Sequence, residues 1–404
     1  MLFQSIRAPV RHAVQSGWLW TYLRQTRKRT AVEWSRPMHL LLCVADHYEP
    51  CWGHVSAAQA AQRVERWVTE YPRCFADFRD SDGRPPRHTF FYPMEDYHAD
   101  HIEQLSELCR AGYGEIEIHL HHDHDTADNL RDRLWEYKHI LAEDHAQLAR
   151  DRHTGEIRYA FIHGNWALDN ARPDGRWCGV NNELDILRDT GCYADLTLPS
   201  FPSPTQTRKI NSIYYAVDDP ARPKSHDWGT DVGVHPPPRR GLLLIQGPLL
   251  LNWRRRKWGL LPTVENACLQ GNQPPSWERL RLWLQARVQV PTRPDWFFVK
   301  LHTHGAPEKN QQVLLGDSMI RFHQSLAETA RHNPLFHYHY VTAREMYNLA
   351  KAAEMGWQGD VAEARDYSLL WQTGDADYSW LPRARSLEAA TRSVPFIDRV
   401  APAG

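Results

Sequence analysis

The sequence predicts an α/β protein built mainly from parallel strands, and three observations support this. Short apolar runs typical of buried strands alternate with longer segments of helical spacing. Strands that are separated by helices in this way pair in parallel through crossover connections. Polar side chains, histidines above all, follow several of the apolar runs at their carboxyl ends, where the sites of parallel α/β proteins assemble.

The stretch from residue 115 to residue 126, EIEIHLHHDHDT, combines these features. Its apolar residues alternate with Glu117, His119 and His121, which is the period-two pattern of a strand with one apolar face. His119 and His121 therefore leave the same face and can converge on one ion. Imidazole and carboxylate ligands without a nearby thiolate suit Zn, Fe, Mn or Ni. We predict a metal site here, since the alternative of a solvated histidine-rich turn does not explain why the histidines begin inside the strand.

Predicted strands and helices follow one another through the first half of the chain. Residues 39–45 form an apolar run typical of a buried strand. Ala60, Val64 and Trp67 then recur on one side of the next segment, which predicts a helix. The predicted strands of this half are 39–45, 88–92, 115–121, 157–162 and 192–198, and the predicted helices are 56–71, 100–110, 127–150 and 182–188.

A proline-rich excursion over residues 199–240 interrupts this alternation, because its eight prolines exclude a helix. Residues 252–258, NWRRRKW, form a basic patch for which a solvated loop is favoured over contact with an anionic ligand. The last fifty residues lack clear periodicity and are predicted to wrap the surface. The later predicted strands are 241–246, 296–301 and 337–341, and the later helices are 276–288, 318–331 and 343–354.

Composition excludes several classes of protein. A net charge of -1 excludes a generally basic nucleic-acid binder. The 17 tryptophans and 16 tyrosines suggest stacking platforms for a flat ligand such as a sugar. Seven cysteines at irregular spacing, without a C-x-x-C pair, indicate neither a disulfide framework nor a thiolate zinc site. Together with the lack of a visible signal peptide, this predicts a cytoplasmic protein.

The first 36 residues form a basic segment, with seven arginines and lysines against one acid, Glu33. Its only apolar cluster, residues 18–23, is too short to span a membrane. One interpretation is a weak peripheral contact with an anionic membrane surface. A helix that packs beside the domain with its charges in water is favoured.

Polar residues at the ends of distant strands are the candidates for chemistry. A divalent ion held by Asp46, His119 and His121 would keep positions open for water and substrate. Asp46 or Glu49 would then act as the base, and a histidine would protonate the leaving group. That histidine is predicted to be His302 or His304. The predicted substrate-binding residues are His163, for which a buried structural role is an equal alternative, Asn165, Trp166 and Asp195.

These motifs resemble the polysaccharide deacetylase (NodB-homology) superfamily. Residues 40–47 resemble the family's opening strand, which ends in Asp-Asp, and His119 with His121 resembles its histidine motif. Residues 191–197 (GCYADLT) and 301–304 (LHTH) resemble two later motifs, the last of which supplies a general acid. The resemblance spans roughly residues 38–345 and implies a distorted (β/α) barrel of about seven parallel strands, a divalent metal ion and N-deacetylation.

The sequence departs from this family at three motifs. His47 stands in place of the second aspartate of the opening pair, so the base and the ligand are not assigned as in the family. Asp123 stands four residues after His119, where the family has a histidine. This leaves His121, His122 and Asp123 as candidates for the second ligand of the motif, and strand geometry favours His121. Residues 163–166, HGNW, replace the Arg-x-Pro motif that orients the base.

The resulting hypothesis is a metal-dependent hydrolase that removes acetyl groups from an N-acetylated sugar in polysaccharide or glycolipid synthesis. Zinc is the first choice of metal, with Fe, Mn, Ni or Co as alternatives. A related glycoside hydrolase that uses a pair of carboxylates and a catalytically inactive carbohydrate-binding protein are the other hypotheses. The predicted organisation is a basic segment over 1–36, a barrel domain over 37–355 and a tail over 356–404 that packs on it.

Overall fold

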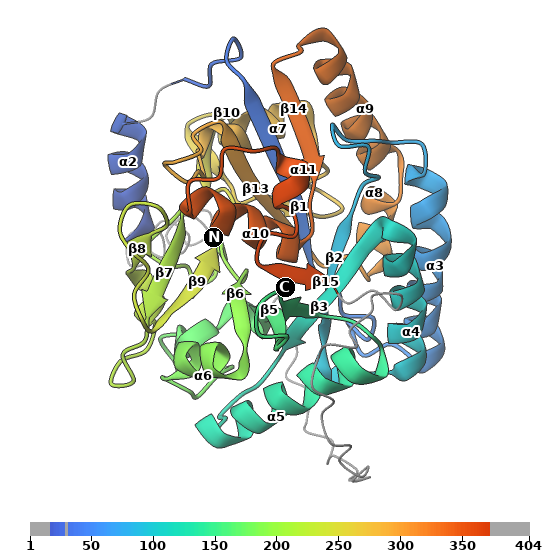
Figure 1. The fold of residues 1–404 in the computed structure, drawn as a ribbon, viewed down its shortest axis with the longest axis vertical. Helices are drawn as coiled ribbons and strands as arrows, with labels where there is room; N and C mark the ends of the chain where they lie inside the picture. The colour runs from blue at the N-terminus through green and yellow to red at the C-terminus, as the bar shows by residue number, and fades with distance from the viewer. Residues whose placement is uncertain (1–16, 29–30, 372–404) are drawn as a thin grey trace.

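The computed structural model describes residues 17–28 and 31–371, and its centre is a large, mostly parallel sheet (Figure 1). The strand order is β12-β13-β1-β2-β3-β5-β6-β9-β7-β8, and β14 also pairs with β1. Neighbours from β12 to β9 in this order are parallel, whereas β7 and β8 form an antiparallel edge. The predicted α/β class with parallel strands is confirmed, and closure of the sheet into a barrel stays a prediction.

The strands reproduce the predicted apolar runs and add several short ones. They are β1 (Met38–His47), β2 (His88–Pro93), β3 (Gly114–Leu120), β4 (Ala149–Asp151), β5 (Ile157–His163), β6 (Cys192–Asp195), β7 (Ile213–Val217), β8 (Thr230–Asp231), β9 (Gly241–Ile245), β10 (Leu250–Lys257), β11 (Leu261–Glu265), β12 (Cys268–Leu269), β13 (Trp296–Thr303), β14 (Phe336–Tyr340) and β15 (Leu369–Trp371).

Four of the α-helices begin after a residue whose side chain caps them. The side chains of Ser56, Thr126, Ser276 and Thr342 each accept a hydrogen bond from a backbone N–H of the first helical turn. The α-helices are α2 (Trp18–Lys28), α3 (Ala57–Phe75), α4 (Ala99–Leu108), α5 (Ala127–His139), α6 (Glu183–Thr190), α7 (Trp277–Gln285), α8 (Glu308–Leu314), α9 (Asp317–His332), α10 (Ala343–Glu354) and α11 (Val361–Ala364).

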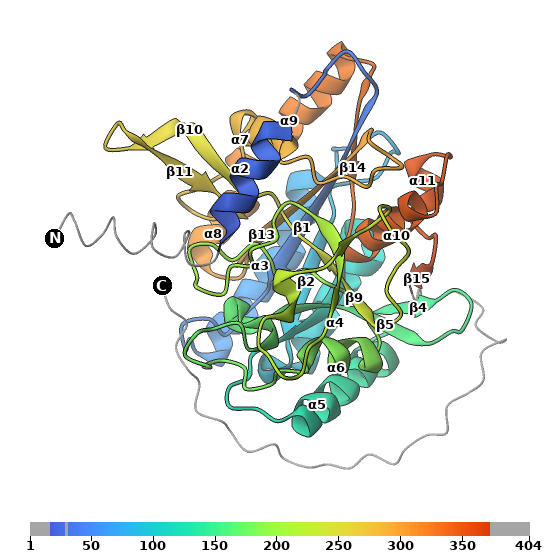
Figure 2. The same ribbon diagram turned by 90° about the vertical axis from the view of Figure 1, so that its left-hand side faces the viewer.

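The strand predicted over 192–198 ends at Asp195, and three further predicted segments also differ from the structure. The helix predicted over 127–150 ends at Asp144 after a π-helical turn, because the chain then reverses into β4. The proline-rich excursion contains β7, which pairs with β9. The basic patch is not a loop: it belongs to β10, which forms a hairpin with β11 that projects from the rest of the protein (Figure 2).

The central sheet is buried on both faces. Leu40 and Leu42 of β1 pack in a core that includes Trp67 of α3, whereas Leu41 packs in a second core that includes Met346 of α10. The polar side of β3 faces this second core. Glu115 there pairs with Arg344, and Glu117 accepts a hydrogen bond from the backbone N–H of Ala160. The alternation in this strand therefore marks one apolar face and one polar face that is buried and paired.

Both ends of the described chain pack on the domain. In α2, Trp18 is buried against Phe201, and Gln25 donates a hydrogen bond to the carbonyl of Ile210, as expected for a helix that lies beside the domain. β15 pairs with β4, so residues up to 371 follow the surface. Residues 1–16, 29–30 and 372–404, which belong to the predicted basic segment and tail, lie outside the described residues. None of the helices that the structure describes has the length and apolarity needed to cross a membrane.

Candidate metal centre

Five metal-ligand side chains gather at the carboxyl ends of three parallel strands. His47 ends β1 and Glu49 follows two residues later, on the same side of the chain. His119 lies near the end of β3, and His121 follows that strand. His304 follows β13, which pairs with β1 so that Thr303 is opposite Asp46. We call His47, Glu49, His119, His121 and His304 the histidine–glutamate cluster.

The carboxylate of Glu49 lies at the centre of this cluster. Its Oε1 atom is 3.3 Å from Nε2 of His119 and 3.8 Å from Nε2 of both His121 and His304. The ring of His47 lies 5.0 Å from that of His119 and 4.7 Å from that of His304, centroid to centroid. One ligand atom each from His47, Glu49 and His119 lies within 4.8 Å of the others, so these three residues could hold a metal ion.

The hydrogen bonds of His119 leave one nitrogen for a cation. Its Nδ1 atom lies 2.7 Å from the carbonyl oxygen of Ile162, which can only accept, so Nδ1 carries the hydrogen. In the neutral ring, Nε2 therefore directs a lone pair at the carboxylate of Glu49. Two facing acceptors in a buried place repel unless a proton or a metal ion lies between them. His47 Nε2 is also buried and has no hydrogen-bond partner among the described residues.

Three imidazoles of the cluster have shifted pKa values, two lowered and one raised. Burial lowers the pKa of His47 well below the usual range, and the neighbouring rings of His304 and His119 add to this. Burial also lowers the pKa of His304. Burial acts in the same direction on His121, but the carboxylates of Glu95 and Glu49 outweigh it and raise the pKa of His121 to about 9. His47 and His304 are therefore neutral near pH 7, the state that binds metal.

Charge also lowers the pKa of the central carboxylate. Burial raises the pKa of Glu49, but His121, His119 and His304 together outweigh this effect, and the net pKa is below the usual value. Glu49 is thus ionised near pH 7.

One side of the cluster is open to solvent. The side chains of His121 and His304 are 27% and 18% exposed, whereas that of His119 is fully buried. The rings of Trp52 and Trp166, both half-buried, lie 5.1 Å and 5.7 Å from that of His304. A ligand that reaches the cluster from this side meets two indole rings.

The structure does not bring Asp46 into the cluster with His119 and His121. Successive residues of β1 face opposite sides of the sheet, so Asp46 points away from His47. Its carboxylate lies 2.8 Å from Nε2 of His88 and accepts a hydrogen bond of 2.6 Å from the backbone N–H of Gly305. Asp46 therefore fixes the turn that carries His304. His47 and Glu49, and not Asp46, lie beside His119, where a metal ligand was predicted.

Replacing Gly305 by alanine should disturb the cluster without removing any of its side chains. A Cβ atom at this position would lie 2.0 Å from Oδ2 of Asp46, so the turn has to move. We expect a lower midpoint of thermal unfolding and weaker metal binding, measured by calorimetry. Gly271→Ala is the matched control, because its Cβ would come no closer than 3.2 Å to a neighbour. Equal metal affinity in Gly305→Ala and wild type would contradict the role given to this turn.

The other predicted site residues lie in four places. Trp166 borders the cluster, and Asn165 lies half-buried in the same turn. His302 is buried beneath the cluster, and its Nδ1 has no hydrogen-bond partner in the part of the chain that the structure describes. The carboxylate of Asp195 accepts hydrogen bonds from the N–H and hydroxyl of Thr197, and burial raises its pKa to about 6. His163 belongs to a second, buried group.

Sequence reasoning did not assign His47 and Glu49 as ligands or Trp52 and Glu95 as neighbours of the site. The i, i+2 spacing of His47 and Glu49 is a signal that could have identified the first two, because it repeats that of His119 and His121.

The described chain contains a further group of potential metal ligands, but this group does not need a metal ion to neutralise its charge. Asp80, Asp82 and His339 lie close together, but Arg365 lies 3.0 Å from Asp80 and 2.8 Å from Asp82. The guanidinium already neutralises these carboxylates.

Comparison with known proteins leaves the chain without an assigned family. No protein-family model matches it, and a search of curated proteins finds no significant match. The resemblance to polysaccharide deacetylases therefore stays a prediction, and the residues of the cluster carry the functional argument.

Proposed function

We propose that this protein is a metal-dependent hydrolase whose centre is the histidine–glutamate cluster, and that it removes the acetyl group of an N-acetylated sugar. The observation that carries the proposal is the convergence of three imidazole Nε2 atoms on one oxygen of Glu49, at 3.3, 3.8 and 3.8 Å. Imidazole nitrogens around an ionised carboxylate form a donor set for a divalent ion.

Three residues of the cluster fit a divalent ion, and its other two histidines are then free for other roles. His47, Glu49 and His119 would hold it, and two histidines with one glutamate is a ligand set of zinc hydrolases. When bound, the ion would polarise a carbonyl oxygen and lower the pKa of a water molecule. The carbonyl of Ile162 orients His119 for this role, because it fixes the ring and its protonated nitrogen.

His121 and His304 are assigned the proton transfers of hydrolysis. They are the most exposed members of the cluster, and each has Nε2 3.8 Å from Glu49. Glu95 contacts Nδ1 of His121 and so leaves Nε2 as its reactive atom. Hydrolysis of an amide requires one group that takes a proton from the attacking water and one that gives a proton to the leaving nitrogen.

The indole rings beside His304 support a carbohydrate substrate. Trp52 and Trp166 border the open side of the cluster, and the apolar face of a sugar ring stacks on such surfaces. An acetamido group on that sugar would bring its carbonyl toward the cluster. The choice of N-acetylated sugars over other amides rests on these rings and on the resemblance of the sequence motifs.

Separate substitutions of His121 and His304 by glutamine test the division between metal binding and proton transfer. Each variant should retain the metal of the cluster and lose at least about a hundredfold in activity toward N-acetylated chitooligosaccharides, the scale of general acid–base catalysis. Elemental analysis and release of acetate measure the two properties. The control is His124→Ala, since that side chain is 81% exposed. Full activity in both glutamine variants would contradict the assignment.

A further inference from the structure

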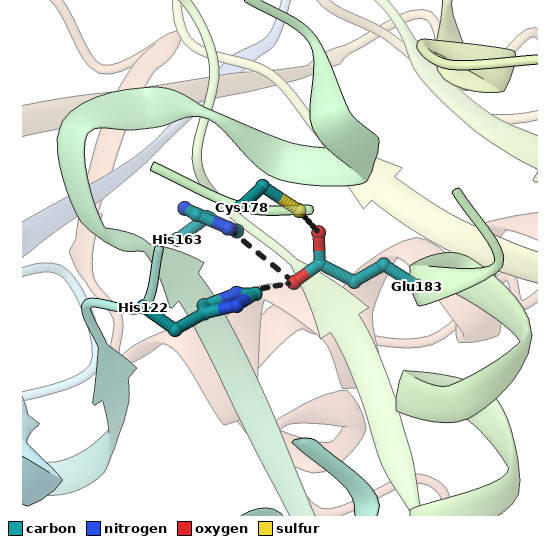
Figure 3. A group of neighbouring side chains, drawn as sticks. All are labelled: His122, His163, Cys178 and Glu183. Carbon is teal, nitrogen blue, oxygen red and sulfur yellow. Dashed lines mark hydrogen bonds and ion pairs between the residues drawn. The ribbon is translucent and has the colours of Figure 1, made fainter. Parts of the chain in front are cut away.

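A second group of metal-ligand side chains lies near the histidine–glutamate cluster and is closed to solvent. His122 follows β3, His163 ends β5, Cys178 lies in the loop before α6, and Glu183 is the first residue of α6 (Figure 3). All four residues are buried. We call them the buried quartet. Three segments of the chain that are far apart in sequence therefore bring imidazole, thiol and carboxylate groups to one point.

The distances in the buried quartet suit a tetrahedral metal ion. Glu183 Oε1 lies 3.2 Å from Nε2 of His122 and 3.5 Å from Nε2 of His163, and Glu183 Oε2 lies 3.4 Å from Sγ of Cys178. Ligand bonds of about 2.0–2.3 Å place the donor atoms of tetrahedral zinc about 3.3–3.8 Å apart. One donor atom from each residue lies within 4.8 Å of the others.

The hydrogen bond of His163 leaves a lone pair directed into the quartet. His163 Nδ1 lies 2.5 Å from the carbonyl oxygen of Gly164 and must donate to it. Its Nε2 then faces Glu183 without a hydrogen-bond partner among the described residues. His122 differs from His163, because its Nε2 makes a hydrogen bond of 3.2 Å with Glu183 Oε1, while its Nδ1 lies 3.2 Å from Asp125 Oδ2. Histidines that bind metals present their second nitrogen to a carbonyl or a carboxylate in this way.

We propose that the buried quartet is a structural zinc site, separate from the hydrolytic centre. Four protein ligands without solvent access are typical of structural rather than catalytic zinc. A thiolate and a carboxylate would supply two negative charges, which a divalent ion neutralises. The spacing of the cysteines does not reveal this site. The site contains one thiol, that of Cys178, and therefore no C-x-x-C pair.

A metal ion here would brace the adjacent active centre. It would tie the end of β5, which leads into the turn of Trp166, to the segment after β3 and to the start of α6. His122 directly follows His121 in the chain, so the same ion would restrain the backbone of the hydrolytic centre. This role does not depend on which reaction the histidine–glutamate cluster performs.

Cobalt(II) substitution tests the buried quartet, because of the two proposed metal sites the quartet alone includes a cysteine. Protein stripped with a chelator and reloaded with Co²⁺ should show a thiolate-to-cobalt charge-transfer absorption band in the near ultraviolet. The band should persist in His119→Ala, which disrupts only the histidine–glutamate cluster, and disappear in Cys178→Ser. Cys192→Ser is the matched control, since Cys192 is also buried but lies outside the quartet.

Two outcomes would overturn the proposal. One is a wild-type protein that binds Co²⁺ but shows no thiolate band, a result that needs no variant to fold. The other is a band that persists in Cys178→Ser. Glu183→Gln, which keeps the size of the side chain, should weaken Co²⁺ binding at least about tenfold. A Co²⁺-loaded wild-type protein that shows the band but releases no acetate would count against the hydrolase proposal alone.

Discussion

Replacing His119 by alanine is expected to remove about one equivalent of divalent metal and to abolish hydrolysis. His119 is fully buried, and its Nδ1 is committed to the carbonyl of Ile162, so its Nε2 is the donor of the cluster that is most firmly fixed. Without it, two of the three proposed ligands, His47 and Glu49, remain. Elemental analysis of purified protein, together with an assay of acetate release, measures both effects.

Glu49→Gln should also lose the metal ion and the hydrolytic activity, but for a different physical reason. The amide keeps the shape of the side chain but removes the negative charge on which the imidazoles converge. His153→Ala is the matched control, because His153 lies exposed in the turn after β4. Metal content equal to that of wild type in both His119→Ala and Glu49→Gln would place the metal elsewhere in the protein.

Replacing Glu345 by alanine is expected to lower the free energy of unfolding by about 3–5 kcal/mol, the cost of breaking a buried ion pair. Glu345 is buried at the start of α10, where Arg87 lies 2.5 Å and Arg365 lies 3.1 Å from its carboxylate. The substitution leaves two buried guanidinium groups without this partner and removes half of the capping box with Thr342. Urea denaturation measures the change.

The same network predicts how stability depends on pH. Burial raises the pKa of Glu345, but Arg87, Arg365 and Arg344 outweigh it and lower the pKa to about 2. A carboxylate whose pKa is lower in the folded state stabilises the protein fully above its unfolded pKa, about 4.3, and loses this contribution as the pH falls toward 2. Glu345→Gln should flatten this part of the profile, whereas Glu328→Ala, on the exposed side of α9, should leave it unchanged. A wild-type acid profile in Glu345→Gln would contradict the assignment.

The alternation in β3 was sufficient to predict the pair His119 and His121, because polar and apolar residues there segregate to opposite faces. It was not sufficient to predict that the polar face is buried. That outcome depends on Arg344 and Tyr193, which come from distant parts of the chain and pair with Glu115 and Glu117.

The orientation of Asp46 could not be predicted from its own strand. Residues 39–45 are apolar on both faces, since Leu40 and Leu41 enter different cores, so the sequence carries no alternation that assigns a face. The register with β13 settles the question, because it places Asp46 against the turn of Gly305.

The buried quartet lay beyond prediction for a different reason. Cys178 precedes α6 in a loop without periodicity, and Glu183 resembles any acidic residue in the first turn of a helix. Only the folding of this loop over the ends of β3 and β5 brings them to His122 and His163.

Anomalous X-ray diffraction at the zinc absorption edge, on crystals grown with zinc, tests the central claim most directly. The proposed hydrolase requires a peak bounded by His47, Glu49 and His119, within bonding distance of about 2.0–2.2 Å of their nitrogen and oxygen atoms. A crystal in which zinc is bound elsewhere, while His119 donates a direct hydrogen bond to Glu49, would contradict it.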